Sequence, residues 1–207
     1  MLGLTSSEFR ILKRLSTPTE IQDWLDRLPM NWDDSGRYLS PHGVMREKKA
    51  HCLEGALFAA AALWVHGERP LVMDLLAARG DEDHVLALYK RNGAWGAISK
   101  TNHATIRFRD PVYRTLRELV LSYFHEWFMN SNGKKTLRSY SAPLDLSRFG
   151  AGWVTAESGL EFVDRELDHT KHYSIIPKGN EKYLRRADAM ELKAGRLVEW
   201  KRRGRGG

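Results

Sequence analysis

The residue with the clearest chemical potential is Cys52, the single cysteine among 207 residues. It stands where a polar stretch ends and an apolar helical run begins. Unpaired backbone N–H groups and the positive end of the helix dipole lower the pKa of a thiol placed there. The thiolate is the nucleophilic form, and the N–H of the same residue could donate to a developing oxyanion. Cys52 is therefore a candidate nucleophile, and the competing interpretation is a buried thiol that does not react.

His84 is the candidate base. It follows the acidic loop at 80–83 and opens an apolar strand, which makes it the polar residue at the strand entrance. A strand edge packed across the start of a buried helix can bring an imidazole within hydrogen-bond reach of a thiol. Because the neighbouring acids favour the imidazolium, we expect a thiolate–imidazolium pair. A surface histidine at the end of a loop is the alternative interpretation.

A third side chain should orient the imidazole. If residues 92–93 form a two-residue hairpin turn, His84 faces Thr101 and lies diagonal to Ser99 on the same face. Asn102 lies one residue further along and would reach the site through a single β-bulge. We predict Asn102 as the orienting residue and keep Ser99 as the second choice.

The elements that must position these residues follow from the hydrophobic pattern. The helix expected at 52–65 is apolar on nearly every side, so it must be buried on most of its surface. Capping-box patterns start two short helices at Thr5 and Thr17. The remaining expectations are strands at 70–77, 84–91, 94–101 and 104–108 and an amphipathic helix at 115–128. The fold class predicted is α+β, with a central buried helix that starts at Cys52 and packs on an antiparallel sheet, and with additional flanking helices.

The length fits a single domain over residues 1–200. We place its core at about 45–128 and a C-terminal helical extension at 130–200, with helices near 157–167 and 187–200. The polar segment 31–49 has the composition of a loop and could line a substrate cleft.

The residues around the candidate pair resemble those of a known family. They are a helix-initiating cysteine in His51-Cys52-Leu53-Glu54-Gly55-Ala56, then Asp83-His84-Val85 on a strand, then Gly93-Ala94-Trp95 leading into the next strand. Over about residues 45–105 the chain resembles the transglutaminase-like superfamily. The resemblance implies a papain-type triad of Cys52, His84 and an Asp or Asn on the next strand, and it implies no organic cofactor. By alignment from Trp95, the usual Asp of the family falls at Ser99.

Charge and composition indicate which classes of binding partner to expect. Basic residues in the tail at 201–207 supply four of the seven net positive charges, so the rest of the chain is mildly basic. A glycine-rich basic end is typical of a solvated tail, and we do not expect nucleic acid as the partner. The longest apolar run, 55–65, is far shorter than the roughly 20 residues of a membrane span, and charges interrupt the N-terminal residues. We expect a cytoplasmic protein with no membrane segment, and a lone cysteine agrees with a reducing compartment.

The sequence thus predicts a thiol-dependent acyl-transfer enzyme that acts on a peptide, protein or small amide substrate. Both hydrolysis and transfer to an amine stay open. We expect no cofactor, and the scattered histidines predict no metal site. The alternative is a catalytically degenerate member of the family that serves as a binding or scaffold protein, because Ser99 stands where a carboxylate is usual. A third hypothesis makes the basic tail a nucleic-acid binding arm. The sequence specifies no oligomeric state.

Overall fold

The computed structural model describes residues 2–33 and 35–201. Its α-helices are α1 (Ser6–Arg14), α2 (Pro18–Asp26), α3 (Pro41–Glu47), α4 (Cys52–Val65), α5 (Leu116–Phe124), α6 (Glu161–His169) and α7 (Ala189–Gly195). Its strands are β1 (Leu71–Ala77), β2 (His84–Arg91), β3 (Ala94–Ile98), β4 (Arg109–Tyr113), β5 (Leu137–Ser141), β6 (Leu144–Asp145) and β7 (His172–Ser174). Short 3-10 helices lie at Leu146–Phe149, Gly152–Val154 and Asn180–Tyr183.

The strands form one antiparallel sheet in the order β4-β3-β2-β1-β5-β7, and β6 pairs with β1. The hairpin between β2 and β3 turns at Asn92 and Gly93, which both have positive φ, at 48° and 84°. This conformation belongs to a type I′ turn. Its register pairs Ala87 with Ile98, so the hairpin register predicted from the sequence is confirmed.

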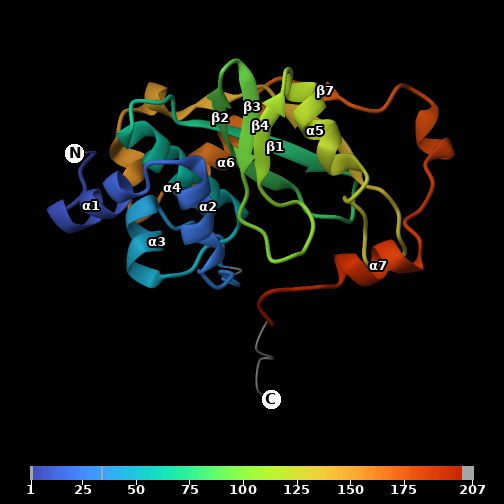
Figure 1. The fold of residues 1–207 in the computed structure, drawn as a ribbon, viewed down its shortest axis with the longest axis horizontal. Coiled ribbons are helices and arrows are strands. Elements are labelled where there is room, and N and C mark those ends of the chain that lie inside the picture. The colour runs from blue at the N-terminus through green and yellow to red at the C-terminus, as the bar shows by residue number, and fades with distance from the viewer. Residues whose placement is uncertain (1, 34, 202–207) are drawn as a thin grey trace.

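The sheet carries helices on both faces. Figure 1 shows α1, α2, α3 and α4 gathered on one side of the sheet and α5 on the other. Residues 53–63 of α4 are all buried, and its alanines allow the helix to approach β2 closely. On the opposite face, Leu119, Val120 and Tyr123 of α5 complete a second cluster of buried apolar residues. The predicted α+β class, with a buried helix that starts at Cys52 and packs on an antiparallel sheet, is confirmed.

A close contact fixes the start of α4 against the end of β3. A Cβ atom on Gly55 would lie 2.4 Å from Cβ of Lys100, so this position of α4 requires glycine. Lys100 is 1% exposed, and its Nζ donates to the carbonyl of Leu28 at 2.5 Å. Burial lowers the pKa of Lys100 to about 8. The contact holds the first turn of the helix against the residues that follow the strand.

Three expected elements differ from the structure. The segment 104–108 lies outside the sheet, and the fourth strand is β4, at Arg109–Tyr113. The strand predicted at 94–101 ends at Ile98. The segment 31–49 is not all loop, because Ser40 caps α3 with Pro41 at its first position.

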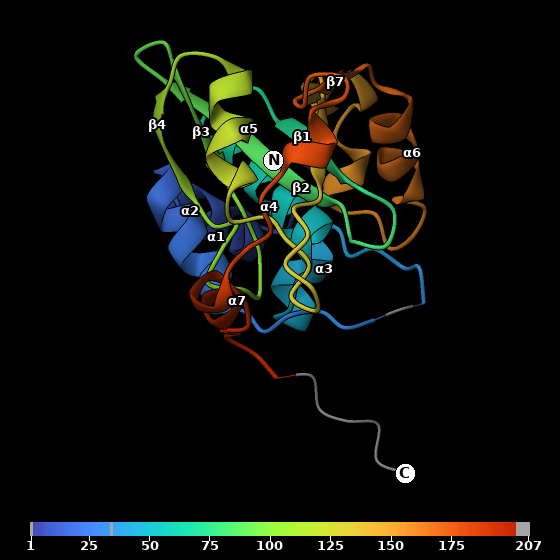
Figure 2. The same ribbon diagram turned by 90° about the vertical axis from the view of Figure 1, so that its right-hand side faces the viewer.

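The segment 130–200, expected to be a helical extension, also contains strands. The helices α6 and α7 lie there, but the same segment supplies β5, β6 and β7. β5 inserts between β1 and β7, so this segment completes the sheet that begins in the core. Figure 2 places β7 and α6 at the opposite end of the molecule from β4, as the strand order requires.

None of the helices within residues 2–33 and 35–201 combines the length and the apolar character needed to cross a bilayer.

Candidate active site

His51 explains why α4 begins at Cys52. Its backbone is extended, and its Nδ1 accepts a hydrogen bond from the N–H of Leu53 at 3.2 Å. In return, the side chain of Glu54 accepts the N–H of His51 at 2.8 Å, which completes a capping box. The Cys52 side chain is half-buried at the first helical position. The thiol therefore lies beside backbone N–H groups that have no acceptor within the helix.

His84 opens β2 and is 8% exposed. Its Nε2 lies 2.8 Å from Oγ of Ser99, and that hydroxyl donates to the carbonyl of Ile106 at 2.6 Å. Because the Ser99 hydroxyl donates its only proton to the carbonyl of Ile106, Ser99 Oγ accepts a hydrogen bond from Nε2–H of His84. The other ring nitrogen, Nδ1, is then the unprotonated one in a neutral imidazole. An unprotonated Nδ1 is the form that a general base needs.

Ser99 is held by contacts on both sides. Its backbone N–H donates to Oε1 of Gln22 at 2.9 Å, and its carbonyl accepts from Nε2 of Gln22 at 2.9 Å. The backbone of Ser99 thus bonds to a side chain and not to a neighbouring strand, and β3 ends at the preceding residue, Ile98. Ile106, at the other end of the hydroxyl bond, has a φ of 59°, a strained conformation for a β-branched residue.

Cys52 and His84 line the same cavity, whose volume is about 550 Å³. The rest of its lining comes from the segments before α3, α4 and β2 and from the segment after β3: Met30, Asn31, Trp32, Asp33, Tyr38, His51, Glu82, Asp83, Lys100, Thr101, Asn102 and His103. The side-chain hydrogen-bonding contact of the thiol is with Nδ1 of His51, at 3.9 Å. Among the described residues no hydrogen bond joins the Cys52 thiol to His84. The structure thus gathers both predicted residues around one cavity, and it places the thiol 3.9 Å from Nδ1 of His51.

The electrostatics correct the expectation of a thiolate–imidazolium pair. Burial raises the pKa of the Cys52 thiol to about 11, although backbone N–H groups of Val85 and Leu53 oppose the rise. Burial also lowers the pKa of His84 to about 4, and the positive charge of His51 or His103 would lower it further. The acidic loop before His84 does not overcome this desolvation. At neutral pH the pair is a thiol and a neutral imidazole.

Asn102, the first choice for the residue that orients the imidazole, makes its side-chain hydrogen bonds with Trp200. The side-chain amide of Asn102 donates to the carbonyl of Trp200 at 2.9 Å and accepts the Trp200 N–H at 2.8 Å. Its carbonyl accepts the N–H of Glu199 at 2.9 Å. Asn102 therefore fastens the C-terminal segment to the rim of the cavity, and Oγ of Ser99, the second choice, accepts the hydrogen bond from His84.

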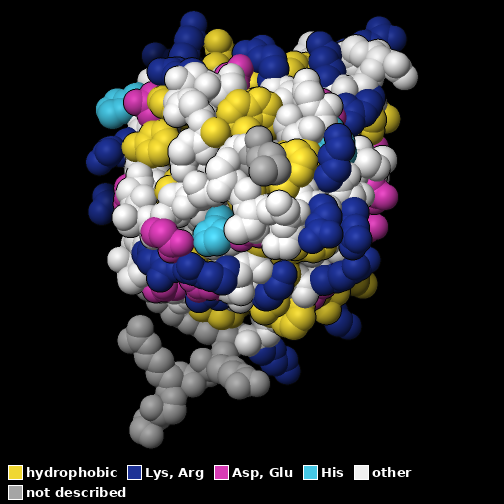
Figure 3. Space-filling view, turned by 90° about the vertical axis from the view of Figure 1, so that its left-hand side faces the viewer, with side chains coloured by type: hydrophobic (Ala, Val, Ile, Leu, Met, Phe, Trp, Pro, Cys, Tyr) yellow, Lys and Arg dark blue, Asp and Glu magenta, His cyan; other side chains and the backbone are white. Residues whose placement is uncertain are grey.

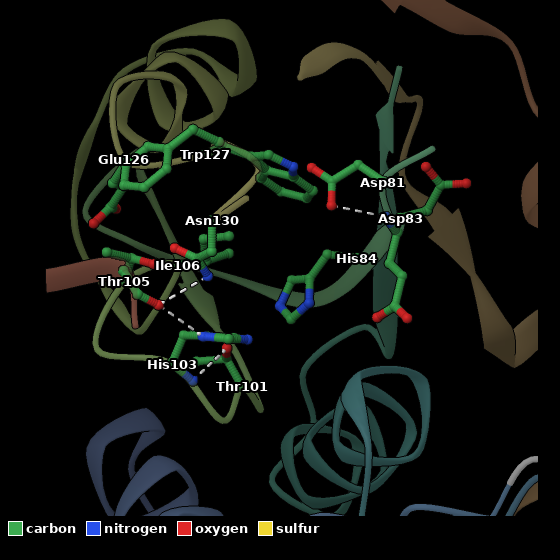
Figure 4. A pocket seen from close by; sticks show the side chains of 13 residues that line it. Asp81, Asp83, His84, Thr101, His103, Thr105, Ile106, Glu126, Trp127 and Asn130 are labelled. Atoms are coloured by element: carbon green, nitrogen blue, oxygen red, sulfur yellow. Dashed lines mark hydrogen bonds between the residues drawn. The ribbon is translucent and has the colours of Figure 1, made fainter. Parts of the chain in front are cut away.

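His84 also lines a second, smaller cavity of about 150 Å³. In Figure 4 the imidazole projects between the carboxylates of Asp81 and Asp83 and a group that includes His103 and Asn130. Trp127 meets the His84 ring edge-on, with ring centroids 6.1 Å apart. His103 Nδ1 and the side-chain amide of Asn130 both contact the carbonyl of Gly195 at the end of α7. The C-terminal segment thus closes the far wall of this cavity.

Sequence reasoning missed Asp74, a buried carboxylate near the thiol. Asp74 lies on β1 and is 5% exposed, and burial raises its pKa to about 7, with further rises from Asp83, Asp168 and Asp164. Its Oδ2 lies 3.7 Å from Nε2 of His172. The negative charge of Asp74 raises the pKa of Cys52. The sequence signal for it is an aspartate within an otherwise apolar strand.

Several basic residues on the described surface stand beside acids. Figure 3 shows Lys and Arg side chains around the face that α1 and α3 occupy, with Asp and Glu side chains next to several of them. Arg46 and Lys49 near α3 pair with Glu157 and Glu47, respectively. Of the predicted basic tail, Lys201 is described, and residues 202–207 lie outside the described residues.

Within residues 2–33 and 35–201 no group of three His, Cys, Asp or Glu side chains is arranged to hold a metal ion. Comparison of the chain with protein-family models and with curated proteins finds no match.

Proposed function

We propose that this protein is a thiol-dependent acyl-transfer enzyme, similar to the transglutaminase-like superfamily, that acts on an amide or peptide bond. The observation that supports the proposal most is the hydrogen bond from His84 Nε2–H to Ser99 Oγ. It leaves the basic Nδ1 of a buried neutral imidazole in the wall of the cavity that also holds the Cys52 thiol. A nucleophile, a base and an orienting group are the three parts that such chemistry needs.

The proposed reaction begins from the neutral pair. The thiol proton of Cys52 passes to an imidazole as sulfur attacks the carbonyl carbon, and the carbon–nitrogen bond then breaks as the leaving nitrogen takes that proton. The backbone N–H of Cys52 is one of the unpaired donors at the helix start and is suited to the developing oxyanion. Water or an amine then releases the acyl group from sulfur.

The uncharged Ser99 in the orienting position lowers the catalytic rate that we expect. A hydroxyl holds the imidazole in the same tautomer as a carboxylate does, but it carries no charge to stabilise the imidazolium. We therefore propose slower chemistry than a site with a carboxylate would give.

Capture of the acyl-enzyme tests this proposal. The protein is mixed with p-nitrophenyl acetate, and its intact mass is followed with time. We expect one acetyl group on Cys52 of the wild type, none in Cys52→Ser, and a rate lower by roughly 10²-fold or more in His84→Ala, the usual range for loss of a general base. Addition of a primary amine then separates transfer from hydrolysis, because an acetylated amine appears among the products of transfer alone. Acetylation of lysines with Cys52 unmodified would contradict the proposal.

The second candidate is a binding or scaffold protein with this fold. Two features favour it: burial raises the pKa of the Cys52 thiol to about 11, and a serine occupies the third position. A thiol of this kind reacts slowly unless a base assists it. Equal rates of acetylation in the wild type and in His84→Ala would favour this candidate.

A further inference from the structure

His51 presents a second imidazole to the thiol. Its Nδ1 lies 3.9 Å from Sγ of Cys52, within hydrogen-bond range for sulfur, and already accepts the N–H of Leu53. A nitrogen that accepts a backbone N–H carries no proton of its own, so in the neutral ring the proton is on Nε2. The His51 side chain is 21% exposed and lines the same cavity as Cys52 and His84. The thiol thus lies within 3.9 Å of a ring nitrogen that carries no proton and whose lone pair now accepts the N–H of Leu53.

Glu54 places a carboxylate beside Nε2 of His51. The Glu54 side chain is completely buried, and its Oε1 lies 3.6 Å from Nε2 of His51. Its carboxylate accepts from the amide of Asn31 at 2.9 and 3.1 Å, from the N–H of Leu39 at 2.8 Å and from the N–H of His51 at 2.8 Å. Because every partner is a donor, the carboxylate is fixed in one orientation with its charge beside the imidazole.

The surroundings keep His51 neutral and ready to accept a proton. Burial lowers the pKa of His51, while the negative charges of Glu54 and Asp164 raise it. The Tyr38 ring meets the imidazole edge-on at 5.5 Å. The titratable groups that face His51 and the adjacent thiol come from several elements: Cys52 and Glu54 of α4, Tyr38 of the segment before α3, Asp164 of α6, Asp74 of β1, Glu82 of the loop before β2 and His84 of β2.

We propose that His51 is a second proton acceptor for the Cys52 thiol, in addition to His84, and that Glu54 orients it. This inference rests on the proposed function. The S–H bond breaks and an N–H bond forms at Nδ1, which releases the N–H of Leu53, and the imidazolium is stabilised by the carboxylate of Glu54. The proton leaves Nδ1 for the departing nitrogen when the carbon–nitrogen bond of the substrate breaks.

The test must distinguish the role of His51 as a base from its role as the N-cap of α4. Asparagine is among the best N-cap residues, so His51→Asn keeps an acceptor for the N–H of Leu53 and removes the titratable ring. The rate of iodoacetamide labelling of Cys52 is measured from pH 5 to pH 10 in the wild type, His51→Asn, His84→Ala and the double variant. His66→Asn, at the other end of the same helix, is the matched control, because His66 contacts the carbonyl of Leu12 and is far along the chain from the thiol.

We expect His51→Asn to slow labelling at pH 7 by about tenfold or more, the double variant to be slower than either single variant, and His66→Asn to match the wild type. Wild-type rates in His51→Asn, together with slow labelling in His84→Ala, would overturn this inference and leave the proposed function in place. A wild-type thiol that reacts only after unfolding would overturn both. Circular dichroism checks each fold, and His51→Ser, a second capping residue without a base, replaces any variant that does not fold.

Discussion

Replacement of Ser99 by alanine removes both bonds of one buried hydroxyl. Ser99 has no exposed surface, accepts from His84 at 2.8 Å and donates to Ile106 at 2.6 Å. Each net hydrogen bond contributes about 1 kcal/mol, and a buried N–H left without an acceptor costs about 1–3 kcal/mol. We therefore expect Ser99→Ala to lower the free energy of unfolding by about 2–4 kcal/mol, with faster amide exchange in the segment that contains Ile106.

Urea unfolding at pH 7 measures the change in stability, and ¹⁵N spectra of the histidine rings report the tautomer of His84. The wild type should show the proton on Nε2, and Ser99→Ala should show a mixture of the two tautomers. Thr101→Ala is the matched control, because Thr101 lies on the same segment and accepts only the nearby N–H of His103 among the bonds described. A loss below about 0.5 kcal/mol in Ser99→Ala, with an unchanged His84 spectrum, would refute the proposed role of the hydroxyl.

Three further predictions follow from other buried contacts. Because burial raises the Asp74 pKa to about 7, the folded protein keeps a proton there that the unfolded chain loses near pH 4, and stability falls as pH rises through 7. In urea unfolding, Asp74→Asn should then be about 2–4 kcal/mol more stable than the wild type at pH 8 and should gain much less stability at pH 4. Equal gains at the two pH values would contradict a raised pKa for Asp74. In the same assay, Gly55→Ala should lower the free energy of unfolding by about 1–3 kcal/mol, because its Cβ would lie 2.4 Å from another side-chain carbon. Gly152→Ala, which has open space around it, is the control and should be nearly neutral. Similar losses in the two variants would disprove this reasoning. Asn102→Ala should speed proteolysis near Trp200 and leave Cys52 labelling unchanged, and slower labelling would instead restore Asn102 as the orienting residue.

Local chemistry made part of the site predictable from the sequence. Asn92 and Gly93 adopt positive φ in a two-residue turn, so the register of the hairpin followed from counting, and with it the position of Ser99 diagonal to His84. The start of the central helix at Cys52 followed from the change from polar to apolar sequence. These features depend on residues that are close together in the chain.

Features that depend on distant residues were not predictable in the same way. Gln22, from the second helix, holds the backbone of Ser99 and ends β3, and Trp200 binds the side chain of Asn102. β5 pairs with β1 across 60 or more positions of sequence, which local patterns do not indicate. The charge states were wrong for another reason: the acids before His84 are visible in the sequence, whereas the burial that outweighs them appears only in the fold.

The pH dependence of iodoacetamide labelling of Cys52, in the wild type and in His84→Ala, tests the proposed Cys52–His84 pair most directly. A base with a pKa of about 4 is already unprotonated at pH 5, so base-assisted labelling of the wild type should be nearly level between pH 5 and pH 9. In His84→Ala the rate at pH 7 should fall by about tenfold or more and should rise more steeply with pH toward the thiol pKa of about 11. Identical profiles in the two proteins, both rising toward pH 11, would contradict the pair and leave a protein whose thiol takes no part in chemistry.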